Sequence, residues 1–245
     1  MRSYSLATAL VALPFITPPS FTRATSELDQ RDGDMTIAVT NHYGAPVQLS
    51  FGVNAGFPGF RGDPQPTTLD EDATNTYAVP SGWAGRIHVG KVDHPDNSKI
   101  EGSFYGAGKG DIDVSYVDGY SVPITCSAGG KVLSGCNIEL MDRECNTPDH
   151  VSAWGPDGKP ALCSNSMRGS DWGPPSAFFA PCAGAAYTFP KDDMANVGMI
   201  PETQISCCIG TSCDPSPRQH KRDLRPNAPS LMPRQHKLHR QFHGK

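Results

Sequence analysis

Residues 110–126 read GDIDVSYVDGYSVPITC, a stretch that combines the alternation of a β-strand with an unusual density of carboxylates. Its alternating core-type residues are Ile112, Val114 and Tyr116. Asp111 and Asp113 fall between them and would point to the opposite, outer face. Asp118 has the parity of the inner set, so it can join the face of Asp113 only if the strand is distorted near the Asp-Gly pair, a turn or bulge signal. The stretch therefore predicts a β-strand with acids on its outer face, followed by a bend.

The carboxylates of this stretch admit two interpretations. Two carboxylates that meet in a cleft raise each other's pKa, so that one can act as an acid and the other as a base. Hydrolysis of a glycosidic bond uses such a pair. Alternatively, acids on the outer face of a strand are ordinary solvated residues, and Asp before Gly is a common turn former. The residues of the stretch leave both interpretations open.

Short alternating runs recur throughout residues 35–215, whereas runs with helical periodicity are scarce. MTIAVTNHYGAPVQLSF (35–51) has the pattern of a hairpin, and TYAVPSGWAGRIHVGKV (76–92) has that of two strands joined by a Pro-Ser-Gly turn. The 25 glycines and 23 prolines among 245 residues indicate many loops. We expect one mostly β, loop-rich domain over residues 35–215.

The N-terminus has the layout of a secretory signal peptide. Arg2 precedes the apolar run LATALVALPFI, residues 6–16, and Ala24 is a small residue at a suitable cleavage point. The apolar run is too short to span a bilayer. We expect residues 1–24 to be a signal peptide, residues 25–34 a polar linker, and the protein to be secreted or bound to a cell wall.

The C-terminal segment, residues 216–245, differs in character from the rest of the chain. It has no apolar periodicity, repeats the pentapeptide PRQHK, and holds eight Lys or Arg against one acid, so that it carries +7 and the remainder −11. This composition predicts a basic, disordered tail on an acidic body. Such a tail can contact an anionic surface, or it can be a solubilising or proteolytically removed segment.

All eight cysteines lie in the second half of the chain and indicate four disulfides in an oxidising compartment. They are Cys126, Cys136, Cys145, Cys163, Cys182, Cys207, Cys208 and Cys213. Their spacing does not determine the pairing. Cys207 and Cys208 are adjacent and would point to opposite faces of a strand, so we expect them to have different partners.

Three segments together resemble the thaumatin-like (osmotin) family: GRIHVGK (85–91), IEGSF (100–104) and IDVSYVDGYSVPITC (112–126). The resemblance implies a β-sandwich with a disulfide-rich loop region beside it and an acidic cleft between the two. Members of the family bind β-1,3-glucans, some hydrolyse them weakly, and several inhibit fungi. Plant members have more cysteines, so the resemblance also implies a reduced-cysteine, fungal-type version whose bridges staple only the loop region.

The resemblance also implies the residues of the cleft. Arg86, Glu101, Asp113 and Asp118 match its arginine, its glutamate and two of its three aspartates. The third aspartate is replaced by Gly184 or Ala185 in the segment CAGAAYTF, which favours binding over hydrolysis.

Catalytic and binding roles follow from this match as hypotheses. Glu101 would donate a proton to the leaving oxygen, and Asp118 or Asp113 would activate water or stabilise the transition state. Arg86 would orient a carboxylate. Trp83 and Tyr120 are candidates for stacking on a sugar ring, with packing at the core as the plainer alternative.

The resemblance implies a secreted protein that binds β-1,3-glucan or another cell-wall polysaccharide, and it leaves open whether the protein also hydrolyses the glucan weakly, as an endo-β-1,3-glucanase. The alternative is a non-catalytic carbohydrate-binding, antifungal or host-interacting protein with a basic contact tail. We expect no cofactor, no metal and no nucleic-acid partner, and we expect a monomer.

Overall fold

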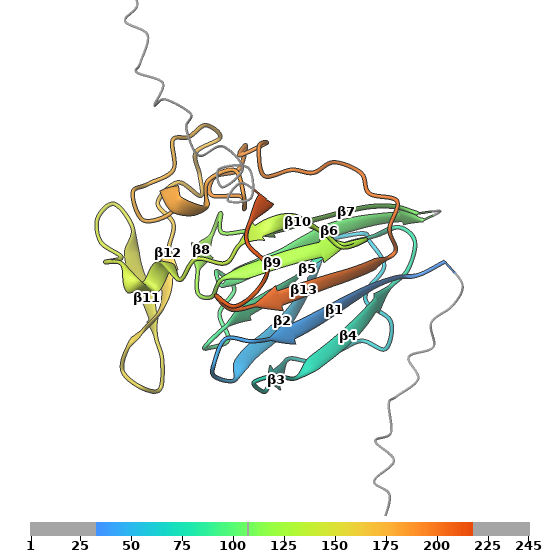
Figure 1. The fold of residues 1–245 in the computed structure, drawn as a ribbon, viewed down its shortest axis with the longest axis horizontal. Coiled ribbons are helices and arrows are strands. Elements are labelled where there is room, and N and C mark those ends of the chain that lie inside the picture. Colours follow the sequence, from blue (N-terminus) through green and yellow to red (C-terminus); the bar gives the residue numbers. More distant parts are fainter. Residues whose placement is uncertain (1–32, 107, 218–245) are drawn as a thin grey trace, which may run out of the picture.

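Two five-stranded β-sheets form the body of the computed structural model, which describes residues 33–106 and 108–217 (Figure 1). The first sheet has the order β10-β9-β13-β1-β4. Its strands are β1 (Met35–Asn41), β4 (Thr74–Val79), β9 (Ile124–Ala128), β10 (Lys131–Cys136) and β13 (Gln204–Ile209). The second sheet has the order β3-β2-β5-β6-β7. Its strands are β2 (Val47–Val53), β3 (Thr67–Leu69), β5 (Trp83–Gly90), β6 (Ser98–Gly106) and β7 (Lys109–Ser115). The fold is mostly β, as the alternating runs predict.

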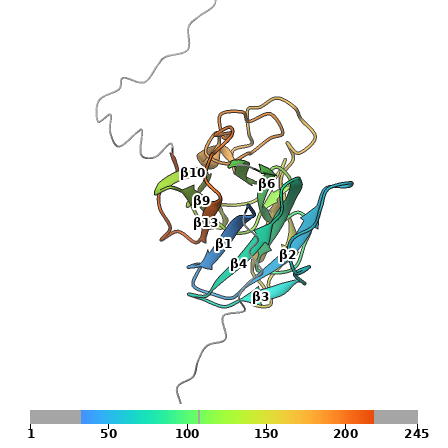
Figure 2. The same ribbon diagram turned by 90° about the vertical axis from the view of Figure 1, so that its right-hand side faces the viewer.

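The first and last strands of the domain lie side by side. β1 pairs in parallel with β13, whereas the other pairings within the two large sheets are antiparallel. Figure 2 shows β1 (blue) and β13 (red) together in one layer. The sheet is therefore complete only when the end of the domain has folded back onto its beginning.

A shared apolar core holds the two sheets together. In β1 the residues Met35, Ile37 and Val39 are fully buried, and in β7 so are Ile112 and Val114. The expected parity of residues 112 and 114 is thus confirmed. Each such aliphatic side chain stabilises the folded state by about 1.5–3 kcal/mol relative to its exposed form. This packing fixes which residues of β7 face outward.

A small third sheet and long loops lie to one side of the sandwich, in the yellow and orange part of Figure 1. The sheet has the order β11-β12-β8, formed by β11 (His150–Trp154), β12 (Pro160–Ser164) and β8 (Gly119–Tyr120). The helical elements in the described ranges are the 3-10 turns η1 (Leu140–Asp142) and η2 (Ala180–Cys182). The short strand β8 comes directly after the bend that follows β7, so it connects the acidic strand to the loop region.

Four disulfides are formed, as the cysteine count predicts: Cys126–Cys207, Cys136–Cys182, Cys145–Cys163 and Cys208–Cys213. Adjacent Cys207 and Cys208 do have different partners. The expectation that the bridges staple only the loop region is wrong. Cys126 and Cys207 lie directly opposite each other on the antiparallel strands β9 and β13, with both side chains buried, so their bridge lies within the sandwich itself.

The predicted signal peptide and nearly all of the basic tail lie outside the described residues. Within the predicted linker, Asp34 is described; it is buried and accepts hydrogen bonds from the Arg61 guanidinium at 2.9 and 3.0 Å. This contact joins the residue just before β1 to the loop that carries Arg61. No helix in the described part of the chain is long and apolar enough to cross a membrane.

Candidate functional site

The outer face of the second sheet carries charged side chains in cross-strand rows. Arg86 on β5 is opposite Glu101 on β6, and Glu101 is opposite Asp113 on β7. In the next row, Lys99 on β6 is flanked by His88 and Ser115. Residues directly opposite on neighbouring strands have Cβ atoms about 4.5–5.5 Å apart, so each row brings its side chains into mutual electrostatic range.

The chain bends after β7, and this bend positions Asp118. β7 ends at Ser115, and the next backbone amide, that of Tyr116, donates to the carbonyl of Tyr187 at 2.8 Å. Gly119 then begins β8 in close contact with two other segments. A Cβ on Gly119 would lie 2.8 Å from the Asp96 carbonyl oxygen and 2.9 Å from that of Cys163. Glycine is therefore required at this position by close backbone approach.

The bend and the rows enclose a groove with a volume of about 280 Å³. Three of the predicted site residues line it: Glu101, Asp113 and Asp118. The other lining residues are Ser115, Val117, Tyr187 and Pro190. We call this cavity the acidic groove. The three acids that the sequence singles out thus lie on one surface.

Two of the three acids have cationic partners. Arg86 Nη1 lies 3.9 Å from Glu101 Oε1, with both side chains about one third exposed at 39% and 34%. Lys99 Nζ forms an ion pair with Asp118, and its side chain is only 5% exposed whereas that of Asp118 is 41% exposed. The lysine is thus a buried cation whose carboxylate partner faces the groove. Burial lowers the pKa of Lys99.

Asp113 differs from the other two acids. Among the described residues, no basic side chain forms an ion pair with it. Burial raises its pKa well above the usual value, and the neighbouring carboxylates of Glu101 and Asp111 raise it further. Burial also raises the pKa of Asp111, whose Oδ1 is buried without a hydrogen-bond partner. Asp113 is therefore a groove carboxyl that retains a proton more readily than an ordinary aspartate does.

His88 does not add a positive charge beside the groove at neutral pH. Burial lowers its pKa to about 4, with further lowering from Lys99 and Arg86. No group of His, Cys, Asp and Glu in the described residues has the arrangement of a metal site. Among the described residues, the basic side chains that form ion pairs with the groove acids are Arg86 and Lys99.

Tyr187 is a groove residue that the sequence analysis misses. Its backbone N–H donates a hydrogen bond to the Val114 carbonyl at 2.9 Å, and its own carbonyl accepts one from the Tyr116 amide. These two bonds hold Tyr187 against the end of β7. The ring is partly buried, and burial raises the pKa of its hydroxyl. The sequence feature that could have identified Tyr187 is the segment AAYTFPKDD, in which an aromatic residue lies close to the position of the missing third aspartate.

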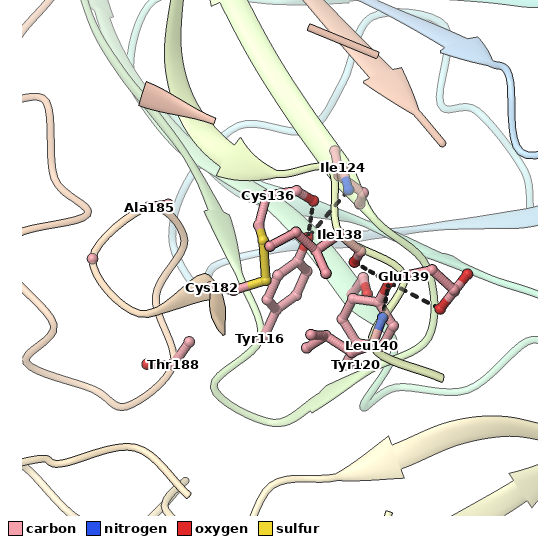
Figure 3. The surroundings of a disulfide bond; sticks show 12 residues. Tyr116, Tyr120, Ile124, Cys136, Ile138, Glu139, Leu140, Cys182, Ala185 and Thr188 are labelled. Carbon is pink, nitrogen blue, oxygen red and sulfur yellow. Dashed lines mark hydrogen bonds between the residues drawn. A yellow bond between two sulfur atoms is a disulfide. The ribbon is translucent and has the colours of Figure 1, made fainter. Parts of the chain in front are cut away.

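Trp83 and Tyr120, the predicted stacking residues, do not line the groove, so this part of the predicted binding set is corrected. Trp83 is 1% exposed and packs edge-on against Phe60 with ring centroids 5.1 Å apart. Tyr120 is fully buried, and its hydroxyl donates to the Ile138 carbonyl at 2.9 Å and accepts from the Leu140 amide at 3.2 Å (Figure 3). Neither ring has a face that a ligand can reach.

Figure 3 shows why the second tyrosine of this cluster is also structural. Tyr116 lies beside Tyr120 and the Cys136–Cys182 bridge, and its hydroxyl donates to the Cys136 carbonyl and accepts from the Ile124 amide, both at 3.1 Å. The two tyrosines join the end of the acidic strand to the loop region. They do not contact a ligand but influence the groove by holding the backbone at the end of β7 in place.

The position of the missing third aspartate has a structural role here. Gly184 and Ala185 are both buried, and the Gly184 amide donates to Asp192 Oδ2 at 3.0 Å. The same Asp192 oxygen accepts from the Thr188 hydroxyl at 2.9 Å. Asp192 thus closes the loop that carries Tyr187 and does not face the acidic groove.

Comparison with known proteins leaves the family open. No family model matches the chain, and no curated protein matches it. Among solved structures, the fold is similar to the crystal structure of the protein elicitor MoHrip2 from Magnaporthe oryzae, with 13% identity and a TM-score of 0.33. The match covers 71% of this chain and 98% of that one. This likeness is too distant to identify a site.

Proposed function

We propose that the acidic groove binds a neutral polysaccharide, with β-1,3-glucan as the ligand class, in a protein that acts outside the cell. The observation that carries the proposal is the gathering of Glu101, Asp113 and Asp118 with the ring of Tyr187 around one cavity. Carboxylates accept hydrogen bonds from sugar hydroxyls, and an aromatic ring offers an apolar surface to a pyranose. The resemblance to thaumatin-like proteins supports the choice of glucan.

The charge of the groove supports a neutral ligand. Three carboxylates line it, whereas its two nearest cations are already engaged with Glu101 and Asp118. Nucleic acids and acidic polysaccharides need unpaired Lys and Arg at their phosphate or carboxylate groups. The groove would repel them. Four disulfides are compatible with an extracellular site of action.

Weak hydrolysis is the second candidate function, and the contrast among the three acids favours it. Carboxyl groups whose environments separate their pKa values can divide the roles of acid and base. Asp113 is suited to hold a proton, whereas Glu101 and Asp118 have Arg86 and Lys99 as cationic partners. We therefore assign the proton donor to Asp113 in place of Glu101, which the resemblance suggests.

The resulting mechanism is a general acid–base hydrolysis. Asp113 would transfer its proton to the glycosidic oxygen as the bond to the anomeric carbon breaks and its electron pair moves to that oxygen. Glu101 would accept a proton from the water that attacks the anomeric carbon. Asp118, which forms an ion pair with Lys99, would stabilise the positive charge of the transition state. Tyr187 would orient the sugar.

Binding and turnover are separated by two measurements on the same variants. Retention on insoluble β-1,3-glucan should fall for Glu101→Gln and Asp113→Asn, while release of reducing ends should be lost in Asp113→Asn if hydrolysis occurs. Asp70→Asn is the matched control, because it makes the same charge change at an exposed residue outside the groove. Equal retention of all four proteins would remove the groove from glucan binding.

A further inference from the structure

A second hollow, with a volume of about 470 Å³, lies in the loop region beside the acidic groove. Its walls are both aromatic and polar and include Trp172, Pro174, Phe189, Lys191, Asp193 and Met194. We call it the Trp172 pocket. The proposed function above does not use it.

The indole of Trp172 is exposed and yet held in place. Trp172 is 70% exposed to solvent. Lys191 Nζ lies 4.8 Å from the ring centroid and at the same time 2.9 Å from Asp171 Oδ2, so an ion pair fixes the cation that packs on the indole. A ring already held in one place loses less conformational freedom when a ligand stacks on it.

The composition of the pocket indicates the chemistry of its ligand. The charge of Lys191 is balanced by Asp171, and Asp193 adds an exposed carboxylate, so nothing in the pocket attracts an anion. A large apolar surface beside a few hydrogen-bonding groups is complementary to a neutral pyranose, which has an apolar face and a rim of hydroxyls.

One continuous segment, residues 187–193, contributes lining residues to both the pocket and the acidic groove, and we call it the shared wall. Tyr187 and Pro190 line the groove, whereas Phe189 and Lys191 line the pocket. Consecutive Cα atoms are about 3.8 Å apart, so Pro190 and Lys191 place the edges of the two hollows one residue step from each other. Asp192, which is buried and accepts from Gly184 and Thr188, holds this wall in its conformation.

We propose that the Trp172 pocket is a second subsite for the same polysaccharide, taking a sugar unit beyond those in the acidic groove. This inference rests on the proposed function of the groove. It makes a prediction that the groove alone does not make: affinity depends on Trp172 only for oligosaccharides long enough to cross the shared wall.

The test is titration calorimetry with a β-1,3-linked glucose disaccharide and hexasaccharide. Trp172→Ala should weaken hexasaccharide binding about tenfold, which corresponds to ~1.4 kcal/mol, and leave disaccharide binding unchanged. Trp172→Phe, which keeps an aromatic ring, should restore most of the affinity. Trp154→Ala is the matched control, since Trp154 is 61% exposed on β11 and lies outside the pocket. Because both tryptophans are exposed, unchanged thermal midpoints are expected for both variants.

Glu101→Gln in the same titrations separates the two hypotheses. If it weakens both ligands while Trp172→Ala weakens neither or both equally, the second subsite is wrong and the groove proposal stands. If Trp172→Ala abolishes binding of both ligands and Glu101→Gln changes neither, the pocket is an independent site, and both proposals are wrong as stated. If the wild type binds neither sugar, both are overturned.

Discussion

Replacing Asp113 by Asn should stabilise the protein at neutral pH, although Asp113 is at the centre of the candidate site. The carboxyl is partly buried between Glu101 and Asp111, and its pKa is raised well above the usual 3.8. A folded-state pKa above the unfolded value contributes stability that is fully present below pH 3.8 and is lost as the pH rises through the folded pKa. Asn stays neutral and therefore avoids this loss.

The magnitude follows from the proton affinity. A tenfold change in proton affinity corresponds to about 1.4 kcal/mol, so Asp113→Asn should raise the free energy of unfolding above the folded pKa by about 1.4 kcal/mol for each tenfold by which burial and the neighbouring carboxylates raise the proton affinity of Asp113. Below pH 3.8 the two proteins should be equally stable. Titrating groups that do not interact with Asp113 cancel in the difference between variant and wild type, so this difference reports on Asp113 and on its neighbours Glu101 and Asp111.

Denaturant unfolding with intact disulfides, repeated across the pH range 3–8, measures this difference, with Asp70→Asn as the charge-matched control. A second variant, Glu101→Gln, should reduce the pH dependence attributed to Asp113, since Glu101 is the first neighbouring charge that raises its pKa. A difference between Asp113→Asn and wild type that does not vary with pH, or a variant less stable at every pH, would refute the electrostatic account of the groove.

Two further predictions concern the framework of the site. Gly119→Ala should destabilise the protein by roughly 2 kcal/mol or more, because the added Cβ would clash with the carbonyl oxygens of Asp96 and Cys163. The same variant should retain less glucan. An unchanged free energy of unfolding would mean that the bend accommodates the added methyl group without strain. Replacing Cys126 and Cys207 together by Ala should cost about 2–5 kcal/mol. The corresponding Cys208/Cys213 variant should lose less free energy of unfolding, because its bridge spans 5 residues instead of 81. Equal losses of stability in thermal unfolding of the two variants would contradict the explanation by chain entropy.

The alternation of residues 111–115 predicts the acidic strand because strand parity is a local property. The same parity could have corrected the prediction for Trp83, which has the phase of buried Ile87 and Val89, whereas Arg86 has the outward phase. The aromatic ring of Trp83 is suited to stacking on a sugar, but the phase of its strand places that ring in the core. Local pattern was the better guide there.

Other parts of the site depend on contacts that no local pattern contains. Asp118 reaches the groove because Gly119 packs against Cys163, and Tyr187 reaches it because its backbone bonds to Val114 and Tyr116. Lys99 has the same outward parity as Glu101, but its side chain is only 5% exposed and forms an ion pair with Asp118, which lies beyond the end of β7. Such tertiary contacts also decide the disulfide pairing, for which eight cysteines leave many alternatives.

The acidic groove and the core constrain each other through a single strand. Ile112 and Val114 hold β7 in register from the inner face, and a slip of one residue would place Asp111 and Asp113 in the core. Burial of those aliphatic side chains thus provides the free energy that keeps an unpaired carboxyl in a crowded acidic groove. A change that loosens the register, such as Ile112→Ala, should therefore relax the raised pKa of Asp113 as well as lower stability. A change confined to the outer face, such as Asp113→Asn, should raise stability and leave the register intact.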